Sequence, residues 1–211
     1  MTAAFSHSLG QKRSSAFVAA FTCSQTSTYR MNRIDIASGI FVIDGLVDLA
    51  ECEALVRRGE KNGFEAAPII TARGTQVDTA TRDNDRYVFD DSALSESLWQ
   101  RARGMIPGTI NGRKAVGLNE RFRLYRYSPG QRFKWHSDAP FHRPNGDISL
   151  LTFMVYLNSG YAGGATRFEG VKVMGNMGQA LVFEHGLIHE GAEVLKGIKY
   201  ALRSDVMFGA R

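Results

Sequence analysis

Apolar and polar residues alternate with the short period of β-strands over much of the chain from residue 118 onward. The pattern predicts strands at residues 121–127, 148–157, 179–185 and 199–208. Residues 148–157 are apolar almost throughout, as expected of a strand that is covered on both faces. Several short strands separated by glycine-rich turns favour a sandwich or a barrel.

The last of these strands has two faces of different character. Its even positions are mostly apolar and are predicted to pack outward against helices: Tyr200, Leu202, Val206 and Phe208. Its odd positions include the charged residues Lys199, Arg203 and Asp205. Charges are costly to bury unless their face lines a wet or ligand-filled cavity. We therefore favour a cavity on this face, with a solvated edge strand as the alternative.

The first half of the chain favours helices. After a short strand predicted at residues 38–44, Asp48 offers an N-cap with Glu51 three positions later, as in a capping box, and Gly63 suits the end of the helix. A second helix is predicted over residues 92–105. Helices followed by a run of short strands indicate the α+β class.

Composition and charge restrict the function classes. The 211 residues suffice for one domain, which we place at residues 31–211. The net charge is +5, but residues 1–30 hold three basic residues and no acidic one, so the remainder is close to neutral. Without a broad basic field, nucleic acid is not an expected partner. No apolar run is long enough to predict a membrane span, and the sequence does not indicate the oligomeric state.

Residues 1–30 are rich in Ser, Thr and Ala. This composition suits a flexible tail, and it also suits an organelle-targeting segment. A true start at Met31 is a third interpretation. Cys23 and Cys52 are too few for a disulfide framework, so a reducing compartment, the cytoplasm, is the expected location unless the first 30 residues direct the chain elsewhere.

One short motif could bind a metal ion. His136 and Asp138 are two residues apart, so on a strand they point to the same side. A second imidazole from a distant strand would complete a facial triad of two histidines and one carboxylate, which suits Fe(II) and leaves positions open. The candidates are His142, His185 and His189.

We favour His189, because the strand that follows it carries Lys199 on the predicted cavity face. Such a cation can pair with the far carboxylate of a metal-bound keto acid. His185 is predicted to lie on the same face of its strand as apolar residues, so it is better interpreted as a hydrogen-bonding residue near the site. His142 lies in a loop bracketed by prolines and is interpreted as a loop residue.

With these residues in place, the chain from 118 to 208 resembles the catalytic core of the prolyl 4-hydroxylase-like Fe(II)/2-oxoglutarate dioxygenases. The matching pieces, in the order of the family, are Arg126-Tyr127-x-x-Gly130, His136-x-Asp138, Tyr156-Leu157-Asn158, Gly163-Gly164-x-Thr166-x-Phe168, His189-Glu190-Gly191 and Gly197-x-Lys199-Tyr200. The resemblance implies a double-stranded β-helix, or jelly roll, with the N-terminal helices packed on one sheet.

The resemblance also implies roles for individual residues. His136, Asp138 and His189 resemble the iron ligands, and Lys199 resembles the residue that binds the C5 carboxylate of 2-oxoglutarate. Three further positions resemble those that assist or line the co-substrate pocket: Tyr127, Tyr156 and Thr166. One further segment, expected to border the mouth of the site, holds Arg82, Asn84 and Arg86. Contact with the substrate and a solvated turn are equal alternatives for it.

The implied reaction is hydroxylation of an unactivated C–H bond. It uses Fe(II), consumes 2-oxoglutarate and O2, and releases succinate and CO2. Ascorbate is a candidate reductant. The implied substrate is a protein or peptide side chain, prolyl included, or a small amino-acid-like molecule. A cupin-like or catalytically silent jelly-roll metal-binding module is the alternative. A nucleic-acid demethylase of the same superfamily is less favoured, because Lys199 replaces the paired arginines of that group.

Two expectations concern neighbours of these residues. Arg203 is expected either to pair with Asp205 or to support the co-substrate site. Trp135, between a lysine and a metal ligand, is expected to lie in the core.

Overall fold

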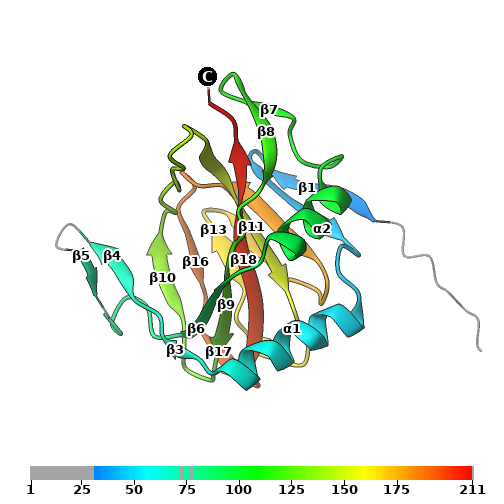
Figure 1. Ribbon diagram of the computed structural model, residues 1–211. Helices are drawn as coiled ribbons and strands as arrows, with labels where there is room; N and C mark the ends of the chain where they lie inside the picture. Colours follow the sequence, from blue (N-terminus) through cyan, green and yellow to red (C-terminus); the bar gives the residue numbers. More distant parts are fainter. Residues whose placement is uncertain (1–30, 72–73, 77, 211) are drawn as a thin grey trace, which may run out of the picture.

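The computed structural model describes residues 31–71, 74–76 and 78–210 (Figure 1). These residues form mostly β-structure with two helices, α1 (Leu49–Asn62) and α2 (Ser92–Ala102). Residues 1–30, for which a tail or a targeting role is predicted, lie outside the described residues. Within the described ranges, neither helix has the length and hydropathy needed to cross a membrane.

The larger sheet is antiparallel and has β11 and β18 at its centre. Its strands follow the order β1 (Asn32–Ala37), β2 (Ile40–Asp44), β15 (Ala180–Glu184), β11 (Ile148–Tyr156), β18 (Lys199–Phe208), β9 (Arg121–Tyr127), β6 (Asp85–Asp90) and β3 (Glu65–Ala66). At the far end of β18, β8 (Arg113–Leu118) pairs with it and carries β7 (Thr109–Ile110).

The smaller sheet lies against the inner face of the larger one. Its order is β10 (Phe133–His136), β16 (His189–Gly191), β13 (Thr166–Phe168) and β14 (Val171–Val173). Two separate pairs complete the structure: β12 (Ala162–Gly163) with β17 (Val194–Lys196), and β4 (Ile69–Thr71) with β5 (Gly74–Gln76).

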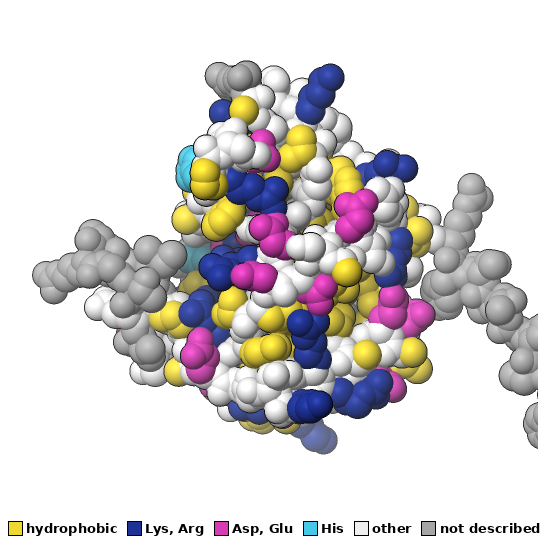
Figure 2. Space-filling view, in the orientation of Figure 1, with side chains coloured by type: hydrophobic (Ala, Val, Ile, Leu, Met, Phe, Trp, Pro, Cys, Tyr) yellow, Lys and Arg dark blue, Asp and Glu magenta, His cyan; other side chains and the backbone are white. Residues whose placement is uncertain are grey.

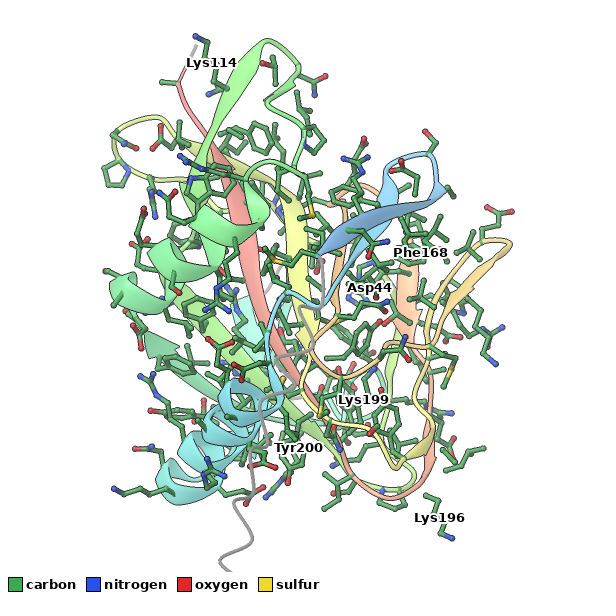
Figure 3. All side chains as sticks on the ribbon, turned by 90° about the vertical axis from the view of Figure 1, so that its right-hand side faces the viewer. Asp44, Lys114, Phe168, Lys196, Lys199 and Tyr200 are labelled. Atoms are coloured by element: carbon green, nitrogen blue, oxygen red, sulfur yellow. The ribbon has the colours of Figure 1, made fainter. Side chains whose placement is uncertain are left out.

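Three layers result, with the helices and the small sheet on opposite sides of the large sheet (Figure 3). On the helix side, Leu124 and Leu202 pack with Cys52 and Leu98 in one apolar core. On the inner side, a second apolar cluster joins the two sheets through Phe168 and other buried residues. The chain therefore has the predicted fold, a jelly roll with helices packed on one sheet.

The first helix begins and ends where the sequence predicts. The Asp48 carboxylate accepts a hydrogen bond from the Glu51 backbone N–H at 2.8 Å, and the Glu51 carboxylate accepts one from the Asp48 N–H at 3.0 Å. Gly63 ends the helix with a φ of 85°, a conformation that glycine adopts without strain. These interactions are local, which is why the sequence predicts them well.

Strand β18 confirms the predicted difference between its faces. Leu202, Val206 and Phe208 are buried in the core on the helix side. Lys199 and Arg203 instead line a cavity between the two sheets. Figure 3 shows the two faces for a pair of neighbouring residues. Lys199 lies between the sheets, whereas Tyr200 lies toward α1, where its hydroxyl donates a hydrogen bond to Glu60.

Three details differ from the sequence predictions. The second helix ends at Ala102, three residues early, and continues as turns. The strand β1 was not predicted; it forms a hairpin with β2 at the sheet edge. Trp135 is 46% exposed and not in the core. Because His136 points inward from β10, its neighbour Trp135 must point outward, and the outer face of this small sheet meets solvent.

Candidate metal centre and co-substrate pocket

Three predicted metal ligands meet between the two sheets. His136 ends β10 and His189 begins β16, and the two residues are direct partners in the strand register. Asp138 follows β10 by two residues. One ligand atom from each residue lies within 4.8 Å of the other two. The Nε2 atoms of His136 and His189 are 3.9 and 3.7 Å from the two oxygens of Asp138.

Backbone carbonyls hold both imidazoles in the tautomer that a metal requires. Nδ1 of His136 donates to the carbonyl of Lys134 at 2.7 Å, and Nδ1 of His189 donates to that of Leu187 at 3.0 Å. Each Nε2 is thereby left with a lone pair that faces Asp138.

The protonation states also suit a metal. Burial lowers the pKa of His136 to about 4 and lowers the pKa of His189, so both rings are neutral at neutral pH. Burial acts to raise the pKa of Asp138, but the charge of Arg203, the two imidazoles and the hydrogen bond from Thr152 together outweigh it and lower this pKa, so the carboxylate is ionised. Two neutral imidazoles and one carboxylate on one side of a cavity are the donor set that Fe(II) accepts in facial-triad oxygenases.

A chain of hydrogen bonds orients the carboxylate of Asp138. Because ionised Asp138 can only accept, the Thr152 hydroxyl must donate to it, at 2.5 Å. The Thr152 oxygen can then accept from Nδ1 of His185 at 3.0 Å, which leaves Nε2 of His185 to accept from Ser149 at 2.9 Å. His185 therefore acts as the predicted hydrogen-bonding neighbour, with Thr152 between it and the ligand.

Lys199 lies in the same cavity as the triad. Its side chain is buried, with the residue only 3% exposed, and Nζ donates to the carbonyl of Gly164 at 2.6 Å. The nitrogen is also 5.4 and 5.3 Å from the ring centroids of Tyr127 and Tyr156. Among the described residues, no carboxylate lies within ion-pair distance of it. Burial lowers the pKa of Lys199 to about 8.

An ammonium group has three N–H donors, so Lys199 retains capacity for a carboxylate. The cavity, with a volume of about 40 Å³, is lined by Lys199, Thr166 and Tyr127 together with the three predicted metal ligands. Tyr156 packs beside it, with its hydroxyl 2.8 Å from that of Thr166. A metal at one end and an unpaired cation at the other suit a short keto diacid.

Two glycines make room for this arrangement. Gly164 has a φ of 66°, and a Cβ on it would come within 3.2 Å of the Lys199 side chain. A Cβ on Gly175 would lie 1.9 Å from the ring of Tyr156. Backbone must approach both side chains closely, which explains glycine at each position.

The predicted mouth residues separate into two roles. Arg82 and Arg86 line a second, outer pocket that shares His136 and Asp138 with the inner cavity. Asn84 is fully buried and lines neither pocket; its side-chain oxygen accepts from Nε of Arg82 at 2.7 Å. Asn84 therefore supports Arg82 in the geometry of the site.

Two further residues, Arg123 and Tyr125, line the outer pocket without having been predicted from the sequence. The alternation of β9 could have indicated both residues, since they lie on the same face of the strand as Tyr127. Arg203 is placed more centrally than predicted. It contacts Asp205 at 3.3 Å as expected, but its shorter ion pair, at 3.0 Å, is with the predicted metal ligand Asp138.

Comparison with known proteins agrees with this geometry. Residues 122–204 match the model of the 2OG-Fe(II) oxygenase superfamily, a stretch that includes all three ligands and Lys199. The chain carries a 2OG-Fe(II) oxygenase core. It is thus an oxidoreductase of the dioxygenase class, and its core resembles that of prolyl 4-hydroxylases.

Solved structures share the fold of this oxygenase core at low sequence identity. The viral collagen prolyl hydroxylase of Paramecium bursaria chlorella virus-1, as its 2OG complex, matches with a TM-score of 0.59 and 19% identity, covering 82% of this chain and 97% of that chain. A Pseudomonas putida prolyl-4-hydroxylase matches with 0.58 and 19%, covering 82% and 93%. A Burkholderia pseudomallei oxidoreductase of the 2OG-Fe(II) oxygenase family matches with 0.53 and 14%, covering 82% and 88%. No curated protein matches the chain.

Proposed function

We propose that the protein uses Fe(II), 2-oxoglutarate and O2 to hydroxylate an unactivated C–H bond of an amino-acid-like group, in a protein side chain, prolyl included, or in a small molecule. One observation carries the proposal. Three metal-type ligands within 4.8 Å of one another share a cavity with a buried lysine that no carboxylate of the described residues neutralises.

The residues fit both groups. Nε2 of His136, Nε2 of His189 and the carboxylate of Asp138 would hold the iron, and Lys199 would hold the C5 carboxylate of 2-oxoglutarate beside Thr166. Together with 2-oxoglutarate and O2, the iron would supply the oxidation of C–H to C–OH, with succinate and CO2 as products. Ascorbate would serve as an external reductant.

Aromatic side chains limit the access of water to the ligands. The ring of Phe133 stacks on His136 with centroids 3.5 Å apart, and Phe183 contacts His189 edge-on at 4.5 Å. Apolar surroundings keep both imidazoles neutral and strengthen electrostatic interactions inside the cavity. The protein therefore contributes binding, orientation and exclusion of water.

The test is release of succinate from 2-oxoglutarate without added substrate. The full chain, given Fe(II) and ascorbate, should form succinate slowly, and His136→Ala should abolish this turnover. His142→Ala is the matched control, because His142 lines neither pocket. Equal turnover in the His136→Ala protein, or 2-oxoglutarate binding without any turnover in the wild type, would favour a metal-binding module instead.

A further inference from the structure

The outer pocket adjoins the candidate metal centre. Its volume is about 450 Å³, and it shares His136, Asp138, Tyr125, Phe133 and Arg203 with the inner cavity. A substrate that binds in this pocket would hold a C–H bond close to His136 and Asp138. The chemistry of the pocket wall therefore reports on the substrate.

Positive charge dominates this wall. Four arginines line it against two carboxylates: Arg82, Arg86, Arg123 and Arg203 against Asp138 and Asp205. In the view of Figure 2, Lys and Arg side chains gather beside a histidine on the side of the molecule where β10 lies.

The two carboxylates are already in use. Asp205 contacts Arg123 at 3.5 Å and Arg203 at 3.3 Å, and Asp138 contacts Arg203 at 3.0 Å. Within the part of the chain that the structure describes, the one ion pair of Arg86 is with Glu65 at 3.8 Å, and the Glu65 side chain is 71% exposed. Such an exposed, long pair neutralises little.

Arg82 has no acidic partner among the described residues, although it is only 6% exposed. Its Nε donates to the neutral Asn84, and its guanidinium lies between the rings of Tyr125 and Phe133, 4.6 and 4.3 Å from their centroids. The side chain is thus held in one orientation. Phe133 also stacks on His136, so a single ring separates Arg82 from a metal ligand.

Among the described residues, four buried polar atoms of this pocket have no hydrogen-bond partner. They are Nη2 of Arg82, Nε of Arg86, Nε of Arg203 and the hydroxyl of Tyr125. Buried donors normally find an acceptor, so a group that lacks one marks a place for a ligand. Burial acts to raise the pKa of Tyr125, yet the charges of Arg82, Arg203 and Arg123 lower it to about 8, which reflects the local excess of positive charge.

From these contacts we infer that the outer pocket recognises a small substrate through an oxyanion, a carboxylate or a phosphate, held by Arg82 with Arg86 and Tyr125. The inference rests on the proposed function and narrows it. A guanidinium presents parallel N–H donors that match an oxyanion. Because Arg82 is one ring away from His136, the oxidised carbon lies in the same small molecule as the anionic group. A neutral peptidyl side chain would leave Arg82 unpaired.

The experiment compares matched pairs that differ only in charge. Free amino acids are tested against their amides, sugar phosphates against the free sugars, and a neutral proline-rich peptide is included. The readouts are succinate formation above the rate without substrate and a mass gain of one oxygen atom. We expect the acids or the phosphates to stimulate succinate formation, and the amides, sugars and peptide to leave it unchanged. The anionic set that stimulates it identifies the oxyanion.

Variants assign the effect to the pocket. Arg82→Gln and the more exposed Arg86→Gln should each raise the KM for the stimulating anion by about tenfold or more. Arg57→Gln, on the outer surface of α1, is the control. Substrate-free turnover also shows that each variant has folded.

The outcomes separate the two proposals. Absence of substrate-free turnover in the wild type would contradict the proposed function itself. If that turnover is present, any of three results would overturn the inference alone. These are stimulation by neutral compounds as strong as by acids, no stimulation by any anionic compound, and an unchanged KM in both arginine variants.

Discussion

Replacement of Lys199 by methionine should have opposite effects on stability and on co-substrate binding. The ammonium is buried, with one hydrogen bond to Gly164 and no acidic partner among the described residues. Burial lowers its pKa from 10.5 to about 8. At about 1.4 kcal/mol per pH unit, this corresponds to roughly 3 kcal/mol of unfavourable free energy for the charged form at neutral pH.

Methionine has similar length and no charge, so Lys199→Met removes this cost. We expect the free energy of unfolding at pH 7, without ligand, to rise by up to about 3 kcal/mol, reduced by about 1 kcal/mol for the lost hydrogen bond to Gly164. The same change leaves a bound carboxylate without its partner. Loss of one member of a buried charge pair costs about 2–5 kcal/mol, so the Kd for 2-oxoglutarate should rise roughly 30-fold to a few thousand-fold.

Urea denaturation measures the first effect. Anaerobic calorimetry with Fe(II)-loaded protein measures the second. Lys196→Met is the matched control, because Lys196 is exposed at the end of β17 and lies away from the cavity (Figure 3). A Lys199→Met protein that binds 2-oxoglutarate as tightly as the wild type would refute the assignment of this lysine.

Three further predictions follow from the same geometry. Since Lys199 must be protonated to hold a carboxylate, and burial lowers its pKa to about 8, the Kd for 2-oxoglutarate should rise above pH 8 by nearly tenfold per pH unit; a flat profile up to pH 9.5 would contradict this. Thr152→Val removes the hydroxyl that orients Asp138, so the Fe(II) affinity measured by calorimetry should fall about 10- to 100-fold, whereas Thr109→Val should not change it. Gly175→Ala forces a Cβ into the Tyr156 ring and should lower the free energy of unfolding by about 1–3 kcal/mol, while Gly186→Ala, with open space around it, should not; equal stability of the two variants would show that the ring can move freely.

The parts of the fold that depend on local interactions were predictable from the sequence. The capping box of Asp48 and Glu51 involves residues three apart, and the glycine at the helix end needs only its own backbone. The same holds for β18, where alternation alone separated Lys199 and Arg203 from the apolar positions. The same alternation could have predicted that Trp135 is exposed, because His136 and its neighbour cannot both face the cavity.

The candidate site was predicted in part. His136 and Asp138 are close in sequence, and the pattern after His189 distinguished it from His185. Nothing local shows that Arg203 contacts Asp138 more closely than Asp205, because that pairing depends on how β18 lies against the loop after β10. The supporting role of Asn84 is likewise a matter of packing.

The sequence by itself determined the secondary structure of the core strands and the chemical types of the candidate metal ligands, since both depend on residue period and on short spacings. Only the tertiary structure decided how charge is distributed around the metal centre. The larger sheet brings β6, β9 and β18 side by side, and the arginines of these strands then share too few carboxylates in the pocket that also borders β10. The strength of an ion pair depends on distance and burial, and both are properties of the folded chain.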